Sequence, residues 1–177
     1  MIALPFAFLP VLNNMKTIWE RRHRLPRREY IGRISVGFTL CLEEPRPFFT
    51  TASVVDVFIG HLKRAASICS VSCIYCFMPE HVHTVTIGAA DNADGLRSME
   101  AFKQYSGWWL KSNRPDVEWQ KSFYDRIVRS DKKLAKLARY TVNNPVRRGL
   151  VSDWRDYPFT GAIGLDLGEF LLDHVDL

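Results

Sequence analysis

Two histidines are the first residues of this sequence whose types and spacing could do chemistry together. His81 and His83 are separated by one residue in the run HVHTVTI, and residues two apart in a β-strand point to the same face. The two imidazoles would then lie side by side and could bind one divalent cation. Because such a pair also occurs as two polar side chains on a half-exposed strand, it does not establish a metal site by itself.

A tyrosine and an asparagine could complete such a site. Tyr140 lies in RYTVNNPVRRGL, and Asn144 follows one helical turn later, on the same face. The amide oxygen of Asn144 is a reasonable third ligand for a hard cation. Asn144 precedes Pro145, which biases its backbone away from the helical region, and Asn143 is the alternative ligand. A tyrosine taken alone is better explained as an amphipathic helix residue with its hydroxyl in water.

Together these residue types indicate one reaction class. A phenol is a poor nucleophile at neutral pH because it is mostly protonated. A divalent cation would polarise a phosphate oxygen and stabilise the charge that develops on it, so that Tyr140 could attack a phosphodiester and form a covalent phosphotyrosine. No GxGxxG, P-loop or GxSxG motif is present to indicate another chemistry.

The charge distribution favours a polyanionic partner. The chain of 177 residues carries a net charge of +5, but the segments 21–33 and 121–148 carry +5 and +7, and 149–177 carries −5. Basic blocks of this kind are typical of nucleic-acid binding, although a solvated basic face without a ligand is the alternative. The candidate DNA-binding residues are Arg21, Arg22, Arg24, Arg27, Arg28, Lys132, Lys133, Lys136, Arg139, Arg147 and Arg148.

The hydrophobic pattern predicts an α+β fold. Apolar residues alternate over 33–42, and the β-branched and aromatic runs 70–78 and 81–88 predict two further strands joined by a short turn. Helical spacing predicts helices over 52–67, 95–111 and 132–143, the last stopped by Pro145. The segment 119–129 is read as a strand with irregular flanks. The order β-α-β-β-α-β predicts a ferredoxin-like sandwich, followed by an added helix and a tail.

Composition and cysteine usage complete the expectation. The 47% hydrophobic and 24% charged residues are typical of a soluble globular chain. We expect residues 1–20 to be an extension that could be mobile, 21–160 to be one domain, and 161–177 to be an acidic tail. The chain shows no convincing export signal and no apolar run of membrane-spanning length, which favours the cytoplasm. Cys73 and Cys76 form a CxxC, which is read as two buried strand residues rather than a zinc or redox site.

Four motifs in sequence order give a specific resemblance. CFMPEHVHTVTI resembles the histidine-hydrophobic-histidine strand of the single-tyrosine HUH transposases, and RYTVNNPVRRGLV resembles their nucleophile helix. WQKSFYDRIVR and the opening RRHRLP resemble one branch of them, the REP-associated tyrosine transposases. The resemblance covers roughly residues 20–160. Glu80 stands where this family commonly has asparagine, and Arg126 stands where histidine is frequent.

The resemblance implies a metal-dependent endonuclease that cuts single-stranded DNA beside imperfect hairpins. It assigns the nucleophile to Tyr140, which would be joined to the 5′ phosphate, and it assigns Mg²⁺ or Mn²⁺ to His81, His83 and Asn144. The expected partner is a REP-like hairpin, the expected location is the cytoplasmic nucleoid, and either a monomer or a homodimer fits.

Two other functions remain open from the residues. One is a ferredoxin-like module that binds single-stranded nucleic acid without cutting it, although no RNP1-like run is present. The other is a small metal-binding or redox protein built on the histidine pair and the CxxC. Neither alternative gives a reason for pairing the two histidines with a helical tyrosine downstream.

Overall fold

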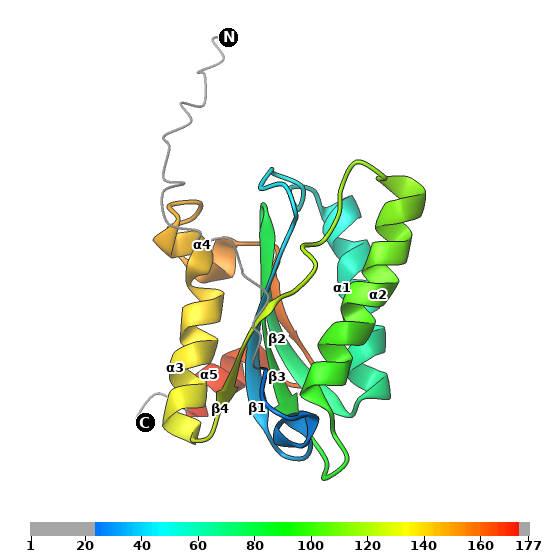
Figure 1. Ribbon diagram of the computed structural model, residues 1–177. Helices are drawn as coiled ribbons and strands as arrows, with labels where there is room; N and C mark the ends of the chain where they lie inside the picture. The colour runs from blue at the N-terminus through cyan, green and yellow to red at the C-terminus, as the bar shows by residue number, and fades with distance from the viewer. Residues whose placement is uncertain (1–23, 174–177) are drawn as a thin grey trace.

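Helices cover both faces of a five-stranded antiparallel sheet (Figure 1). This computed structural model describes residues 24–173. The strands are β1 (Ser35–Cys41), β2 (Val71–Met78), β3 (His81–Gly88), β4 (Tyr124–Val128) and β5 (Thr160–Ile163), in the spatial order β4-β1-β3-β2-β5. The first four strands have the order of a ferredoxin-like sandwich, so the predicted fold class is confirmed.

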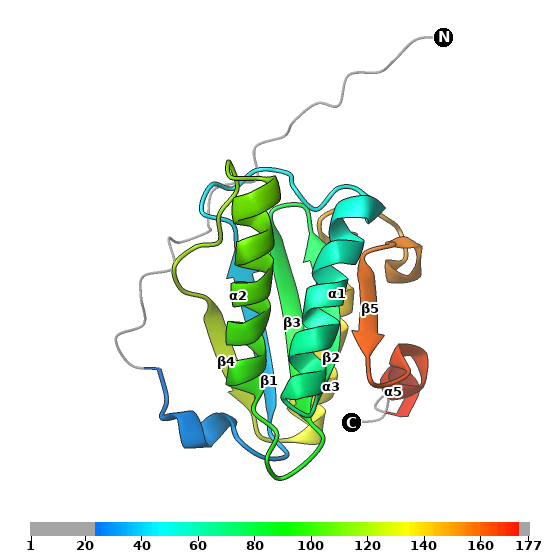
Figure 2. The same cartoon turned by 90° about the vertical axis from the view of Figure 1, so that its right-hand side faces the viewer.

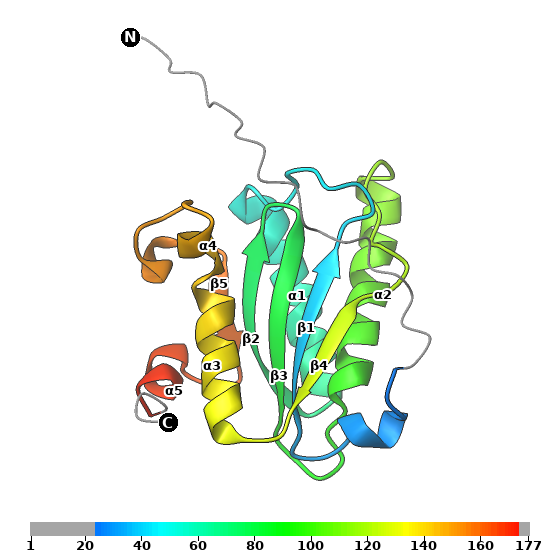
Figure 3. The same ribbon diagram turned by 60° about the vertical axis from the view of Figure 1, so that its left-hand side comes forward.

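The long helices lie in two separate layers. Helices α1 (Ala52–Ile68) and α2 (Gly95–Asn113) cover one face of the sheet (Figure 2). Helix α3 (Asp131–Val142) lies along the opposite face (Figure 3). The remaining short elements are the 3-10 helices η1 (Arg27–Tyr30) and η2 (Trp154–Asp156) and the helices α4 (Asn144–Arg147) and α5 (Leu167–Asp173). No helix of residues 24–173 is long and apolar enough to span a bilayer.

Strand alternation separates two hydrophobic layers. Val36, Phe38 and Leu40 of β1 pack beneath α1 and α2, in the larger core with Phe58 and Phe102. The opposite face of the sheet packs against the apolar side of α3, through Ile74, Val85, Val128, Leu134, Ala138 and Val142. An apolar face of a strand must be covered, and α3 is the cover for the face of β3 that carries Val85.

The chain beyond residue 160 is part of this packing. Residues 161–177, expected to be an acidic tail, begin within β5, which pairs with β2. Helix α5 then packs on the α3 side of the sheet through Leu167, Phe170 and Leu171. The packed structure therefore continues to residue 173, and Asp166, Glu169 and Asp173 are exposed on it.

Candidate active site

The two histidines of β3 lie side by side. Both follow the strand period onto the face that α3 covers, and their Nε2 atoms are 3.0 Å apart. Neighbouring ligands in an octahedral shell, each about 2.1 Å from the ion, are separated by about 3.0 Å. The pair therefore has the spacing of two adjacent metal ligands.

The other ring nitrogen of each histidine faces an oxygen. Nδ1 of His83 lies 3.0 Å from the hydroxyl oxygen of Thr39, and Nδ1 of His81 lies 3.5 Å from a carboxylate oxygen of Glu80. Burial lowers the pKa of His83 to about 3, and the charges of His81 and Arg147 act in the same direction. His83 is therefore neutral at physiological pH, which is the form that binds metals.

Tyr140 reaches the histidines from α3. Its ring is perpendicular to that of His83, with 6.0 Å between ring centroids and an interplanar angle of 82°. The guanidinium of Arg147 lies 4.4 Å from the centre of the Tyr140 ring. The side chain of Tyr140 is 45% exposed, so a ligand can reach it from solvent. One chain thus supplies both the tyrosine and the histidine pair.

Asn144 is bonded to the backbone of Tyr140 but does not lie on α3. Helix α3 ends at Val142, and Asn144 is the first residue of the short helix α4, in which Pro145 occupies the first turn. Proline is tolerated there because first-turn amides have no helical acceptor. The amide nitrogen of Asn144 donates to the carbonyl oxygen of Tyr140 at 2.8 Å, which leaves its amide oxygen for another partner. Asn143 is less buried and donates in the same way to Arg139.

The donor set fits a divalent cation. Within residues 24–173 no three His, Cys, Asp or Glu side chains are grouped so that they could hold a metal. Two imidazoles do not complete a metal shell, and the buried amide of Asn144 is the candidate for a further oxygen ligand. Two imidazoles and an amide oxygen, completed by water or phosphate, suit Mg²⁺ or Mn²⁺.

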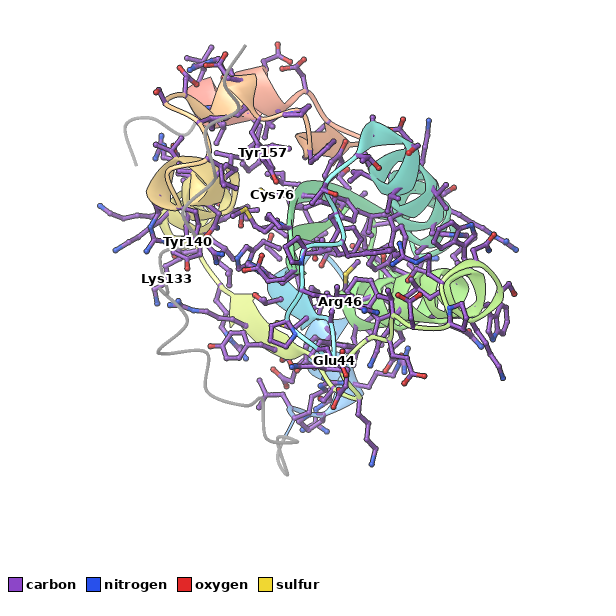
Figure 4. The ribbon with its side chains drawn as sticks, turned by 90° about the horizontal axis from the view of Figure 1, so that it is seen from above. Glu44, Arg46, Cys76, Lys133, Tyr140 and Tyr157 are labelled. Atoms are coloured by element: carbon purple, nitrogen blue, oxygen red, sulfur yellow. The ribbon has the colours of Figure 1, made fainter. Side chains whose placement is uncertain are left out.

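A basic groove runs between α3 and the sheet. Its volume is about 700 Å³ and its walls come from β1, β3, β4 and α3. His83 and Tyr140 line it together with four cationic side chains, Arg126, Arg129, Lys133 and Lys136. Lys133 and Tyr140 both project from α3, whereas Glu44 and Arg46 lie well away from this helix (Figure 4).

Gly37 allows α3 to approach the floor of the groove. A Cβ atom at this position would lie only 2.6 Å from a methyl carbon of Leu137. The alternation of β1 predicts Gly37 and Thr39 on the face away from the main core, and both line the groove. Small side chains here leave room for a ligand beside His83.

The predicted DNA-binding residues fall into two groups. Lys133 and Lys136 line the groove, and Arg147 contacts the Tyr140 ring. The other described residues do not line the groove. Four of them form ion pairs: Arg24 with Asp125, Arg27 with Asp94 and Glu100, Arg28 with Glu29, and Arg148 with Glu80. Arg139 donates to the carbonyl oxygen of Leu171, and Lys132 is exposed. Arg21 and Arg22 lie outside the described residues.

Sequence reasoning missed three residues of this groove. Arg126 and Arg129 belong to the basic segment 121–148 but are not among the candidate DNA-binding residues, and Thr39 is a polar position in the alternating run 33–42. A strand period over 124–128 would place Tyr124 and Arg126 on one face, and both line the groove. Attention to that alternation would have identified Arg126.

The CxxC residues do not form a joint site. Cys73 belongs to the core under α1 and α2, whereas Cys76 packs with Met78 and Tyr157 on the other face. Burial raises the pKa of Cys73 to about 12 and that of Cys76 to about 11. Two protonated thiols on opposite faces of β2 match their interpretation as buried strand residues.

The fold and this site define a ferredoxin-like sheet that presents His83 and Tyr140 in one basic groove, with His81 buried beside His83. The chain is 26% identical over 98 residues to a protein of Haemophilus influenzae named "Putative REP-associated tyrosine transposase". The aligned region covers 48% of this chain and 54% of that protein. The chain thus spans about half the length of this curated relative. No family model matches the sequence.

A solved structure supports the same assignment of fold. The structure of a REP-associated tyrosine transposase bound to a REP hairpin superposes with a TM-score of 0.62 at 20% identity, over 78% of this chain and 82% of that chain. The sequence and structural similarities together confirm the resemblance to REP-associated tyrosine transposases that the four motifs indicate.

Proposed function

We propose that this chain is a tyrosine nuclease and transposase that cuts and rejoins single-stranded DNA beside hairpins. One observation carries the proposal: the exposed phenol of Tyr140 contacts His83 within a basic groove, and Nε2 of His83 lies 3.0 Å from Nε2 of His81. A nucleophile, a pair of metal-binding nitrogens and cationic walls are the parts that phosphodiester cleavage requires.

Mg²⁺ or Mn²⁺ would be held by His81, His83 and Asn144. When bound, the ion polarises a phosphate oxygen and stabilises negative charge on it. The chain's own contribution is to hold the two imidazoles adjacent, with His83 buried, and to hold Tyr140 beside His83. The Arg147 guanidinium over the phenol ring orients Tyr140 and adds positive charge where the phosphate would lie.

The reaction exchanges one phosphodiester for another. The Tyr140 oxygen attacks the phosphorus and loses its proton to water, and a P–O bond forms to the phenol. The bond from phosphorus to the 3′ oxygen breaks, and that oxygen takes up a proton as the free 3′ hydroxyl. The 5′ end stays on Tyr140 as a phosphotyrosine. Because the bonds made and broken are alike, a 3′ hydroxyl can reverse the step and rejoin DNA.

The groove supplies a path for the strand. Lys133, Lys136 and Arg126 could each neutralise a phosphate along its length, whereas Arg129, which also lines the groove, pairs with Glu29. The solved relative is bound to a REP hairpin, and we infer that a similar hairpin beside the cut site is the partner here. Such a substrate places the protein at the nucleoid in the cytoplasm. Because one chain supplies the candidate residues, a monomer is sufficient, although a homodimer is compatible with the same chemistry.

A covalent-adduct assay tests this function. Labelled single-stranded DNAs that carry hairpins from near the gene are mixed with the protein and Mn²⁺, or with EDTA, and resolved on a denaturing gel. We expect a slowly migrating band that requires both metal and Tyr140. Salt-sensitive binding without an adduct would instead favour a module that holds single-stranded nucleic acid without cutting it.

A further inference from the structure

Glu80 is a buried carboxylate in the turn that leads into the histidine strand. It immediately precedes His81 and is only 9% exposed. A guanidinium nitrogen of Arg148 donates to its Oε1 atom at 2.7 Å. This ion pair holds the buried carboxylate of Glu80 in a fixed position beside His81.

The same oxygen faces the outer nitrogen of His81. Oε1 of Glu80 lies 3.5 Å from Nδ1 of His81. Nδ1 is buried and makes no hydrogen bond in the described chain, whereas Nε2, on the other side of the ring, faces His83. The carboxylate thus stands behind His81, away from the nitrogen that would bind an ion.

This arrangement has a chemical consequence for metal binding. An imidazole binds a metal through a nitrogen that carries no proton, so its other nitrogen must carry one. Histidine ligands commonly donate that proton to a carboxylate or carbonyl oxygen, which fixes the ring and makes it a better ligand.

We propose that Glu80, oriented by Arg148, is the positioning residue that keeps a proton on Nδ1 of His81 and thereby presents Nε2 to a divalent cation. The inference rests on the proposed metal site. A bound ion would hold the His81 ring so that Nδ1 can donate to Glu80. Thr39 has the corresponding position behind His83, at 3.0 Å, but carries no charge.

Mn²⁺ affinity provides the first test, measured without DNA by electron paramagnetic resonance of the free ion. Glu80→Met removes the acceptor at similar volume, and Arg148, which is half-exposed, can turn to solvent. We expect Mn²⁺ to bind about 10- to 100-fold more weakly. Glu80→Gln keeps an oxygen acceptor and should lose less. Glu44→Met, an exposed residue far from α3, is the matched control and should leave the affinity unchanged.

The position of the proton provides the second test, by ¹⁵N NMR of the histidines in the metal-free protein. We expect Nδ1 of His81 to carry a proton in the wild type and in Glu80→Gln, and to lose it in Glu80→Met. A wild-type protein with a bare Nδ1, or a folded Glu80→Met variant with wild-type Mn²⁺ affinity, would overturn the inference. Should Glu80→Met fail to fold, the wild-type and Glu80→Gln spectra still decide it.

Neither measurement involves DNA, so the outcome is independent of the cleavage assay. Loss of Mn²⁺ affinity in Glu80→Met, found together with no adduct in the wild type, would support this role of Glu80 and overturn the proposed nuclease. If the wild type forms the adduct but Glu80→Met keeps its Mn²⁺ affinity, the proposed nuclease is supported and the role of Glu80 is overturned.

Discussion

The imidazole of His83 and the phenol of Tyr140 meet edge to face, with 6.0 Å between their ring centroids, although one lies on β3 and the other on α3. The contact exists because α3 packs on the face of the sheet that carries the histidines. It places the candidate nucleophile beside one of the two candidate metal-binding histidines.

Replacing Tyr140 by phenylalanine should abolish the covalent adduct while leaving DNA binding nearly intact. Only the hydroxyl is lost, and the ring that contacts His83 and Arg147 remains. A surface change of this kind alters binding by about twofold or less. Adduct gels and binding isotherms on the same hairpin DNA measure the two effects. Cutting by this variant at the wild-type rate would assign the nucleophile to another residue.

Thr39→Val should weaken Mn²⁺ binding. Valine has nearly the same shape but cannot bond to Nδ1 of His83, which Thr39 contacts at 3.0 Å. Loss of such an outer partner costs about tenfold or more in metal affinity. Thr39→Ser keeps the hydroxyl and serves as the matched control. Titration with Mn²⁺ gives both affinities, and equal values for the valine and serine variants would show that the hydroxyl has no such role.

Removing Lys133 and Lys136 should reduce both the affinity for single-stranded DNA and its dependence on salt. Each lost phosphate contact lowers the slope of log K against log salt by about 0.7 for a single strand. The matched control is the double variant Lys63→Ala and Lys111→Ala, which removes two exposed lysines from α1 and α2 on the opposite side of the sheet. Fluorescence anisotropy over a range of KCl concentrations measures the slopes. A larger loss of DNA affinity in the control variant would show that the DNA binds at α1 and α2 instead.

Tyr30→Phe should destabilise the fold. The Tyr30 hydroxyl donates to the buried carboxylate of Asp125 at 2.6 Å, and this bond ties the N-terminal segment to β4. Its loss leaves Asp125 with fewer donors, at a cost of about 1–3 kcal/mol in the free energy of unfolding. Urea denaturation at pH 7 measures this difference.

The same pair predicts a pH dependence. Burial, followed by the neighbouring Asp125 carboxylate, raises the pKa of Tyr30 from 10.0 to about 12. The folded state therefore favours the protonated phenol, and this contribution to stability is complete below pH 10 and is lost as the pH rises towards 12. The difference in unfolding free energy between wild type and Tyr30→Phe should shrink over that interval. A constant difference would contradict the raised pKa.

Much of the fold could be predicted because its signals are local. The alternation over 33–42 and the helical spacing over 52–67 and 95–111 depend only on neighbouring residues, and they match β1, α1 and α2 closely. The sequence does not predict the short strand β5 and helix α5, because their few apolar residues are interspersed with acidic residues between 153 and 173. That segment acquires structure by pairing with β2 and packing beside α3, which are contacts with residues far away in the sequence.

The same distinction between local patterns and tertiary contacts applies to the candidate site. Strand periodicity alone places His81 and His83 on one face, and the one-turn spacing relates Tyr140 to Asn144. The division of the basic residues followed from tertiary contacts: Lys133 and Lys136 line the groove, whereas Arg24, Arg27 and Arg148 pair with Asp125, Asp94 and Glu80. A count of charges cannot make this division, because ion pairs form between residues distant in the chain.

The sequence by itself thus determined the order of elements, the α+β class and the residues able to do chemistry. These follow from side-chain period and residue type, which act over a few positions. Only the tertiary structure decided that Tyr140 meets His83, that a groove opens between α3 and the sheet, and that Glu80 lies behind His81. Such relations depend on how helices pack on a sheet, where the volume of one residue, such as the absent side chain of Gly37, determines how closely two elements approach.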